Sequence, residues 1–245
     1  MATQIALVLA VASALALACQ AHADDPVHSD ASRSTIRIIC LGDSITKGAR
    51  PGVAEDETYE AQLHKQLATR GIATEIINVG LGGERTDQAV RRLDADVIAR
   101  KPALCTVMYG TNDSAVDQGG TEPRLPIADY EANLRRIVAA LRAAGIVPLL
   151  MTPPPLGDRF DYMAWSPYKE RGPNHLLVEY VRRVRNVADE EGVALVDNFA
   201  RWAEVQLLGT DLDDLMTDGC HPNPLGQRLI AETMQGVVVR ATRRP

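Results

Sequence analysis

Short apolar segments that alternate with helix-like segments are the feature that most constrains the fold of this 245-residue chain. Each apolar segment is a continuous run, rather than an alternation of apolar and polar residues. A continuous apolar run predicts a strand that is buried on both faces, and such strands occur in parallel sheets. The predicted strands cover residues 35–41, 72–79, 103–109, 146–151 and 193–196.

The segments between these strands have the apolar spacing of helices. In residues 129–144, apolar side chains from Leu134 to Leu141 lie on one helical face, and Gly145 is a typical helix stop. The predicted helices cover residues 58–70, 86–100, 129–144, 174–191 and 225–240. Strands separated by helices in this way predict an α/β fold, with a five-stranded parallel sheet covered by helices on both faces.

Composition sets limits on the function. Apolar residues make up 46% of the chain and charged residues 24%, which fits one packed domain. The net charge is −6, without a long basic run. Because phosphate binding needs a clustered basic face, this composition disfavours nucleic acid as a partner.

The first 23 residues are typical of an export signal. Residues 5–19 are small or apolar except for Ser13, and Ala21-His22-Ala23 fits a small-x-small cleavage site. This apolar run is shorter than the ~20 residues that a membrane-spanning helix needs, so we expect no stable membrane span. Lipid attachment at Cys19 is an alternative, but Ala rather than Leu stands at the third position before this cysteine.

The export signal defines the expected organisation. We predict a signal peptide at residues 1–23, an N-terminal linker at residues 24–34 and one domain at residues 35–245, in a secreted or periplasmic protein. The cysteines left after cleavage are Cys40, Cys105 and Cys220. The first two fall in predicted buried strands, where a free cysteine acts as a small apolar residue, so no disulfide framework is expected.

Polar residues follow three of the predicted strands. Ser44 follows the first strand, glycines at residues 80–83 follow the second, and Asn112 follows the third. Ligands of parallel sheets gather at these carboxyl ends, so the three positions are expected to meet at one site. Each motif alone is also an ordinary turn. Neither a Gly-x-Ser-x-Gly elbow nor a dinucleotide-binding Gly-x-Gly-x-x-Gly pattern is present.

A serine hydroxyl needs a base, and the base needs an acid that orients it. His221 has an aspartate, Asp218, three residues before it, so one short loop can present both groups. His175 is the alternative base, and His64 is expected at the surface. Cys220, next to His221, raises a thiol nucleophile as an alternative, although side chains of sequence neighbours seldom point at each other.

Taken together, the chain resembles the SGNH (GDSL-type) hydrolase family. The resemblance rests on Gly42-Asp43-Ser44, on Gly83 within residues 78–86, on Gly110-Thr111-Asn112-Asp113, and on the Asp218 and His221 pair. The four blocks occur in the family's order over residues 35–240. Glu84 is a departure, because many relatives have aspartate there.

The resemblance implies a flavodoxin-like, three-layer α/β/α sandwich and ester hydrolysis without a metal or another cofactor. Ser44 would be the nucleophile, His221 the base and Asp218 the orienting acid. The N–H groups of Ser44 and Gly83 and the side-chain amide of Asn112 would form the oxyanion hole.

An aromatic segment between Pro153 and Pro173 is the main indication of substrate. It contains Phe160, Tyr162, Trp165, Tyr168 and Arg159, and it follows the fourth predicted strand. Aromatic faces suit sugar rings, although these rings equally suit packing against the sheet edge. With the export signal, this segment favours a small-molecule or carbohydrate ester as substrate, with hydrolysis of short-chain or O-acetyl esters.

Other functions remain open. A lysophospholipase or thioesterase would use the same catalytic residues. A metallophosphoesterase would need several histidines and aspartates around two metals, and only three histidines remain in the predicted domain. A non-catalytic sugar-binding module is a further alternative, although such a module would more often have lost Ser44 or His221.

Overall fold

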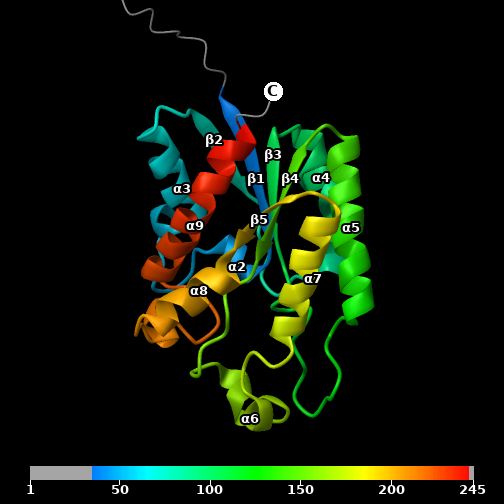
Figure 1. Ribbon diagram of the computed structural model, residues 1–245, viewed down its shortest axis with the longest axis vertical. Coiled ribbons are helices and arrows are strands. Elements are labelled where there is room, and N and C mark those ends of the chain that lie inside the picture. Colours follow the sequence, from blue (N-terminus) through cyan, green and yellow to red (C-terminus); the bar gives the residue numbers. More distant parts are fainter. Residues whose placement is uncertain (1–34, 243–245) are drawn as a thin grey trace, which may run out of the picture. The chain divides into compact units, whose positions relative to one another are not determined.

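The computed structural model describes residues 35–242, so the predicted signal peptide and linker lie outside the described residues. Five parallel strands form one sheet in the order β2-β1-β3-β4-β5 (Figure 1). The strands are β1 (Ile36–Gly42), β2 (Thr74–Asn78), β3 (Leu104–Met108), β4 (Val147–Thr152) and β5 (Ala194–Asp197). The predicted α/β fold with a five-stranded parallel sheet is confirmed.

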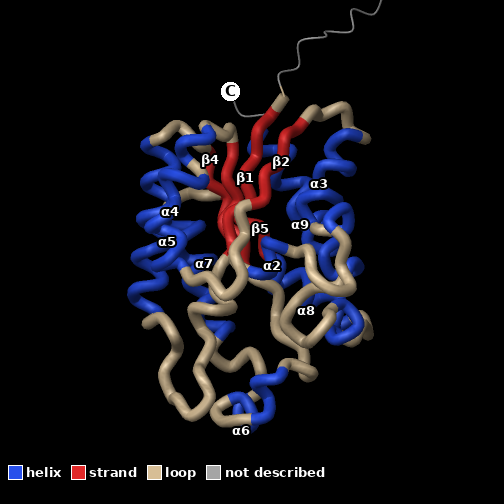
Figure 2. Tube along the Cα trace, turned by 180° about the vertical axis from the view of Figure 1, so that it is seen from behind, coloured by secondary structure: helices blue, strands red, loops and turns tan. Residues whose placement is uncertain are grey.

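Helices cover both faces of the sheet (Figure 2). One layer holds α3 (Tyr59–Ala68), α8 (Asn198–Leu207) and α9 (Pro224–Thr242), and the other holds α4 (Thr86–Asp96), α5 (Ile127–Ala143) and α7 (Leu177–Glu190). Successive side chains of a strand point to opposite faces. In β1, Ile38 and Cys40 therefore enter the core under α3 and α9, whereas Ile39 and Leu41 enter the core under α4 and α5.

The helices differ from the sequence-based prediction in two ways. One predicted helix ends earlier than expected, and three helices were not predicted. The helix expected at residues 86–100 ends at Asp96, and a 3₁₀ turn follows at Ile98–Arg100. Helix α8 was not predicted, and it begins where the Asp197 side chain accepts a hydrogen bond from the Ala200 N–H. The described chain also contains two single-turn helices, α2 (Ser44–Lys47) and α6 (Tyr168–Arg171).

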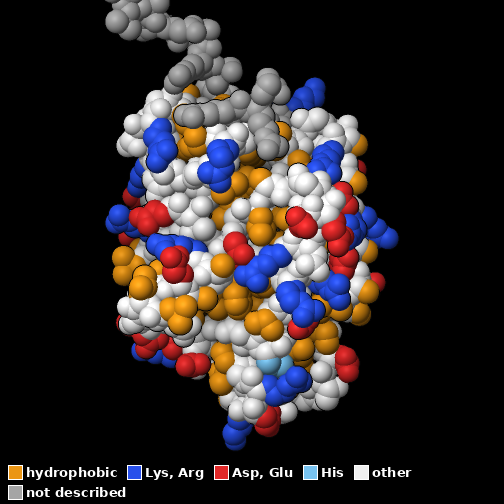
Figure 3. Space-filling view, viewed as in Figure 1, with side chains coloured by type: hydrophobic (Ala, Val, Ile, Leu, Met, Phe, Trp, Pro, Cys, Tyr) orange, Lys and Arg blue, Asp and Glu red, His pale blue; other side chains and the backbone are white. Residues whose placement is uncertain are grey.

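Surface features within residues 35–242 bear on possible partners. No helix in this part of the chain is long and apolar enough to cross a bilayer. On the face shown in Figure 3, acidic and basic side chains are interspersed. That face therefore carries no continuous basic patch of the kind that binds nucleic-acid phosphates.

Candidate active site

Ser44 is the first residue of α2, directly after the carboxyl end of β1. Asp43 caps this single-turn helix, because its Oδ1 accepts a hydrogen bond from the Ile45 N–H at 2.8 Å. At Gly42 a side chain has no room, since a Cβ there would lie 2.7 Å from the Met108 carbonyl oxygen of β3. The turn from β1 to α2 thus requires glycine and holds Ser44 at the edge of the sheet.

The hydroxyl of Ser44 contacts the imidazole of His221. Ser44 Oγ lies 2.8 Å from His221 Nε2, and His221 Nδ1 lies 2.8 Å from Asp218 Oδ2 and 3.0 Å from Oδ1. With the proton on Nδ1, this nitrogen donates to the carboxylate and Nε2 accepts from the serine. The structure therefore brings together the three residues predicted as nucleophile, base and acid, in a geometry that permits proton transfer from serine to histidine.

The loop that carries Asp218 and His221 is fixed by its own backbone. Asp218 Oδ1 accepts hydrogen bonds from the N–H groups of Cys220 at 3.0 Å and His221 at 2.8 Å. Gly219 has φ +75°, and a Cβ there would lie 2.3 Å from the Phe160 nitrogen. The Arg50 guanidinium lies 3.5 Å from Asp218 Oδ2, the oxygen that His221 Nδ1 also contacts, so a cation lies beside this carboxylate.

Asn112 lies beside the serine and is held by Asp43. Its side-chain amide donates to Asp43 Oδ2 at 3.2 Å. An amide has two N–H donors, so the second can be offered to a ligand. Burial raises the pKa of Asp43 to about 7, although its bond from the Ile45 N–H acts in the opposite direction.

Gly83 lies in the turn between β2 and α4. Its φ of +74° is in the left-handed region, and a Cβ there would meet no atom within 4 Å. Within residues 35–242 its N–H donates to no acceptor, so this donor is unpaired. The same turn packs on α2, because a Cβ at Gly80 would lie 2.3 Å from the Lys47 nitrogen. The Leu81 N–H also donates to the Gly42 carbonyl at 3.0 Å, which ties the turn to the end of β1.

A cavity of about 200 Å³ opens on Ser44, His221 and Asn112. Of the predicted substrate rim, Phe160 and Tyr162 line it. Arg124 also lines it, donating to the Tyr162 hydroxyl at 2.8 Å and pairing with Asp117 at 2.7 Å. Arg124 was not predicted as a site residue, because it lies in the long connection between β3 and α5 and belongs to no motif.

The other three predicted rim residues do not line this cavity. Tyr168 is buried, and its hydroxyl accepts a hydrogen bond from the Val116 N–H at 2.8 Å. The Trp165 and Tyr162 rings are tilted by 40° with centroids 4.4 Å apart, and the exposed Arg159 lies 3.8 Å from Asp213. These contacts agree with the alternative that part of the aromatic segment packs against the rest of the fold.

Of the two rival catalytic residues, Cys220 lines the same cavity as Ser44, whereas His175 does not. His175 packs edge-on against Tyr168, and its Nδ1 lies 2.7 Å from the Gly172 carbonyl oxygen. Cys220 is buried with Leu156 and Leu177, and burial raises the pKa of its thiol well above the ordinary value. Such a thiol stays protonated and is a poor nucleophile. No group of three or more potential metal ligands is found within residues 35–242.

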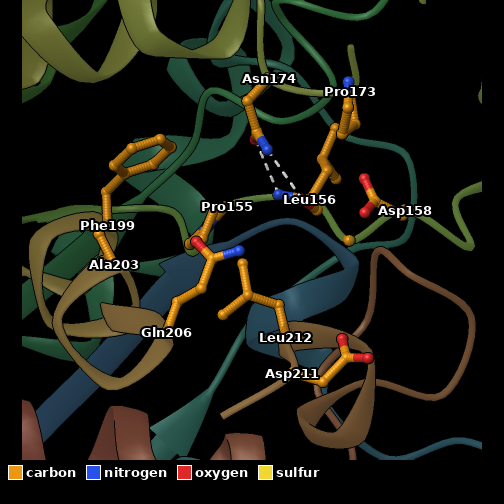
Figure 4. Close-up of a pocket in the computed structure, with 11 residues that line it drawn as sticks. Pro155, Leu156, Asp158, Pro173, Asn174, Phe199, Ala203, Gln206, Asp211 and Leu212 are labelled. Atoms are coloured by element: carbon orange, nitrogen blue, oxygen red, sulfur yellow. Dashed lines mark hydrogen bonds between the residues drawn. The ribbon is translucent and has the colours of Figure 1, made fainter. Parts of the chain in front are cut away.

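A second cavity, of about 210 Å³, lies between α8 and the segment that follows β4 (Figure 4). Phe199 and Gln206 border it from α8, and Leu156 borders it from the opposite side. The Asn174 side-chain amide makes two hydrogen bonds with the backbone of Leu156. Its nitrogen donates to the Leu156 carbonyl and its oxygen accepts from the Leu156 N–H, both at 2.8 Å. None of the residues predicted for catalysis lines this cavity.

Esterases are found both among the known proteins of similar sequence and among those of similar structure. Residues 40–229 match the family model of the GDSL-like lipase/acylhydrolase family. The chain is 28% identical to the uncharacterized lipoprotein YqeF of Bacillus subtilis, over 81% of this chain and 87% of that protein. It is 27% identical to the bovine isoamyl acetate-hydrolyzing esterase 1 homolog, over 79% of this chain and 78% of that protein. A solved variant of an acetyl-xylooligosaccharide esterase from Geobacillus superposes with a TM-score of 0.67 at 26% identity, covering 86% of this chain and 95% of that one.

Proposed function

We propose that this protein is an exported serine esterase for short acyl esters, because the chain belongs to the GDSL-like lipase/acylhydrolase family and is a carboxylic ester hydrolase. The observation that carries the proposal is the continuous contact from Ser44 through His221 to Asp218, with a shortest distance of 2.8 Å at each step. This arrangement supplies a nucleophile, a base and an orienting acid.

In the proposed reaction, Ser44 Oγ attacks the ester carbonyl carbon while His221 Nε2 takes the hydroxyl proton. The carbonyl π electrons move to oxygen, and the resulting oxyanion is held by the N–H groups of Ser44 and Gly83 and by the Asn112 amide. Collapse of the tetrahedral intermediate breaks the bond to the alcohol, which leaves with the proton from His221. Water, deprotonated by His221, then attacks the acyl-serine and releases the acid.

For the substrate, we propose O-acetyl or other short-chain esters on carbohydrates. Support comes from the small cavity beside Ser44 and from the rings of Phe160 and Tyr162 in its wall. Both the Geobacillus neighbour and a 27%-identical relative from Xylanibacter ruminicola carry names of acetylated-xylan esterases. The chain spans only 43% of the Xylanibacter protein, so the comparison applies only to the matched part of that protein.

A panel of esters tests this substrate proposal. Purified protein lacking residues 1–23 would be incubated with acetylated xylo-oligosaccharides, lysophospholipids and acyl thioesters, with Ser44→Ala as the blank. We expect acetate release from the oligosaccharides to be fastest. Faster release of fatty acid from lysophospholipids would overturn the carbohydrate assignment while leaving the esterase assignment intact.

Export is the second part of the proposal. It rests on the apolar run at residues 5–19 and the small residues around Ala23. N-terminal sequencing of the mature protein from an expressing bacterium is expected to begin at Asp24. A mature chain that begins at a lipid-modified Cys19 would instead show that the protein is a lipoprotein, and an uncleaved chain in the cytoplasm would contradict export.

A further inference from the structure

Glu84, the residue after Gly83, has its carboxylate buried against two other elements. Only 5% of Glu84 is exposed. Its Oε1 accepts from Arg92 Nε at 2.6 Å, and its Oε2 accepts from Arg92 Nη2 at 2.5 Å and from the Tyr109 hydroxyl at 2.6 Å. Arg92 lies in α4, and Tyr109 follows the last residue of β3. The carboxylate therefore joins the turn that carries Gly83 to the end of a central strand.

Arg92 ties the other end of the same turn. Its Nη2 also donates to the Val79 carbonyl at 2.7 Å, and its Nη1 pairs with Asp96 at 2.9 Å. The turn at residues 79–85 is thus held at its first residue, Val79, by a bond from Arg92. Near its last residue it is held by the bonds that Glu84 accepts from Arg92 and Tyr109. Gly83 lies between these two attachments, so the direction of its N–H depends on them.

A second contact runs parallel to the first. Thr86, two residues after Glu84, donates to Asp113 Oδ1 through its N–H at 2.9 Å and through its hydroxyl at 2.7 Å. Glu84 and Thr86 therefore bind Tyr109 and Asp113, the two residues that flank the Gly110–Asn112 turn. Both contacts start from residues that closely follow Gly83 in the chain. One ends at Tyr109, before Asn112, and the other ends at Asp113, directly after Asn112.

We propose that Glu84 is a positioning residue, which acts through Tyr109 and Arg92 to hold the Gly83 N–H and the Asn112 amide in register around the oxyanion. This inference rests on the proposed function, because it assigns both donors to that site. Donors aimed in advance at the developing charge lower the barrier, since no reorganisation is needed at the moment of reaction. A small misalignment of either donor therefore lowers kcat more than it weakens substrate binding.

The protonation states suit this role. Burial, and next the neighbouring Glu84 carboxylate, raise the pKa of Tyr109 well above the ordinary tyrosine value. The Tyr109 hydroxyl therefore keeps its proton and donates to Glu84 throughout the neutral range. Arg92 compensates the buried negative charge of Glu84, and the side chain of Arg92 is itself only 14% exposed. A buried charge with several hydrogen bonds is held in one geometry, which is what a positioning group needs.

A purely stabilising contact is the alternative, and a pair of tyrosine variants separates the two. Tyr109→Phe removes the hydroxyl that bonds to Glu84 and leaves the Glu84–Arg92 ion pair in place. Tyr180→Phe is the matched control, because Tyr180 is as buried as Tyr109 and its hydroxyl donates to the Leu125 carbonyl, and not to Glu84 or to the turn that carries Gly83. Both variants lose one buried hydrogen bond, so both are expected to unfold at a similarly lowered temperature.

We would measure kcat and KM for p-nitrophenyl acetate and the unfolding temperature by circular dichroism. We would also measure the inhibition constant of an alkyl boronic acid, because such an acid forms a tetrahedral adduct with a catalytic serine. For Tyr109→Phe we expect kcat to fall about tenfold, KM to stay within about twofold, and boronate affinity to fall in parallel with kcat. For Tyr180→Phe we expect kcat within about twofold of the wild type.

Glu84→Asp gives a second test that does not depend on Tyr109→Phe folding. Aspartate keeps the charge opposite Arg92 but is one methylene shorter, so we expect it to lose the hydrogen bond from the Tyr109 hydroxyl. A loss of kcat with an unchanged KM is expected here too. Equal kcat values for the two tyrosine variants, or full activity of Glu84→Asp, would overturn the positioning role. Absence of turnover by the wild-type protein would overturn the proposed function, and this inference with it.

Discussion

Ser44 Oγ lies 2.8 Å from His221 Nε2, although 177 positions separate the two residues in the sequence. The parallel sheet produces this contact, because β1 delivers Ser44 to its carboxyl edge and the loop before α9 returns to the same edge. The chemistry that we propose depends on this contact and on the donors around it.

Asp218 is expected to orient His221 through the bonds at 2.8 and 3.0 Å. Replacement by asparagine keeps the shape but favours the wrong histidine tautomer, so we expect kcat of Asp218→Asn to fall about 10³–10⁴-fold. Steady-state hydrolysis of p-nitrophenyl acetate measures the effect. Asp214→Asn, at an exposed carboxylate close by in sequence, is the matched control and should retain activity. A loss of less than about tenfold in Asp218→Asn would contradict the role.

Asn112 is expected to donate to the oxyanion through the N–H that is not bonded to Asp43. Asn112→Ala should therefore lower kcat about 10²–10³-fold with little change in KM. Asn186→Ala, at an exposed position in α7, controls for loss of an amide elsewhere. Should the Asn112 variant instead raise KM at unchanged kcat, the amide would be a substrate-binding group and not a transition-state donor.

Asp43 should make the fold less stable as the pH rises. Burial raises its pKa from 3.8 to about 7, so between these values the folded protein binds more protons than the unfolded chain. Stability is then lost as the pH rises through this window, by at most about 4 kcal/mol. Burial raises the pKa of Asp113 to about 6, which adds an effect of the same sign.

Urea unfolding of the wild type and of Asp43→Asn, at about pH 5 and about pH 8, measures this contribution. The variant cannot titrate at this position, so its stability should change less between the two conditions. Asp189→Asn, at an exposed site in α7, should keep the wild-type difference. An equal pH dependence in Asp43→Asn and wild type would show that Asp43 does not titrate in this range.

The cavity beside Ser44 is about 200 Å³, which limits the ester that fits. We expect kcat/KM for p-nitrophenyl acetate to exceed that for the octanoate by about tenfold or more, with both substrates kept below micelle formation. The ratio is measured with one enzyme preparation under one set of conditions. A higher kcat/KM for octanoate would favour a lysophospholipase-like role.

Cys220 provides a test of the thiol alternative. Because the thiol is buried and protonated, Cys220→Ser should change kcat by no more than about twofold, with a modest loss of stability. Cys40→Ser, in β1, controls for the loss of a buried thiol away from the cavity. Loss of turnover only in the Cys220 variant would reopen the thiol as nucleophile.

Much of the fold and the proposed triad could be predicted from local sequence. The strand at residues 35–41 has a continuous apolar pattern, and Asp218 and His221 lie close enough in sequence for one loop to present both. Helix α8 was missed, although Asp197 caps it, because it follows a strand of four residues without an intervening turn. Glu84 could not be assigned a role, because its partner Tyr109 is 25 positions away and becomes a neighbour only in the folded sheet.

The most direct test of the central claim is to trap the acyl-enzyme. After rapid mixing with p-nitrophenyl acetate and acid quenching, peptide mass spectrometry is expected to find one added acetyl group on the peptide that contains Ser44. Ser44→Ala should fold with an unchanged circular dichroism spectrum, carry no acetyl group and show no turnover above the uncatalysed rate. Acetylation of another residue, or full turnover by Ser44→Ala, would contradict the account.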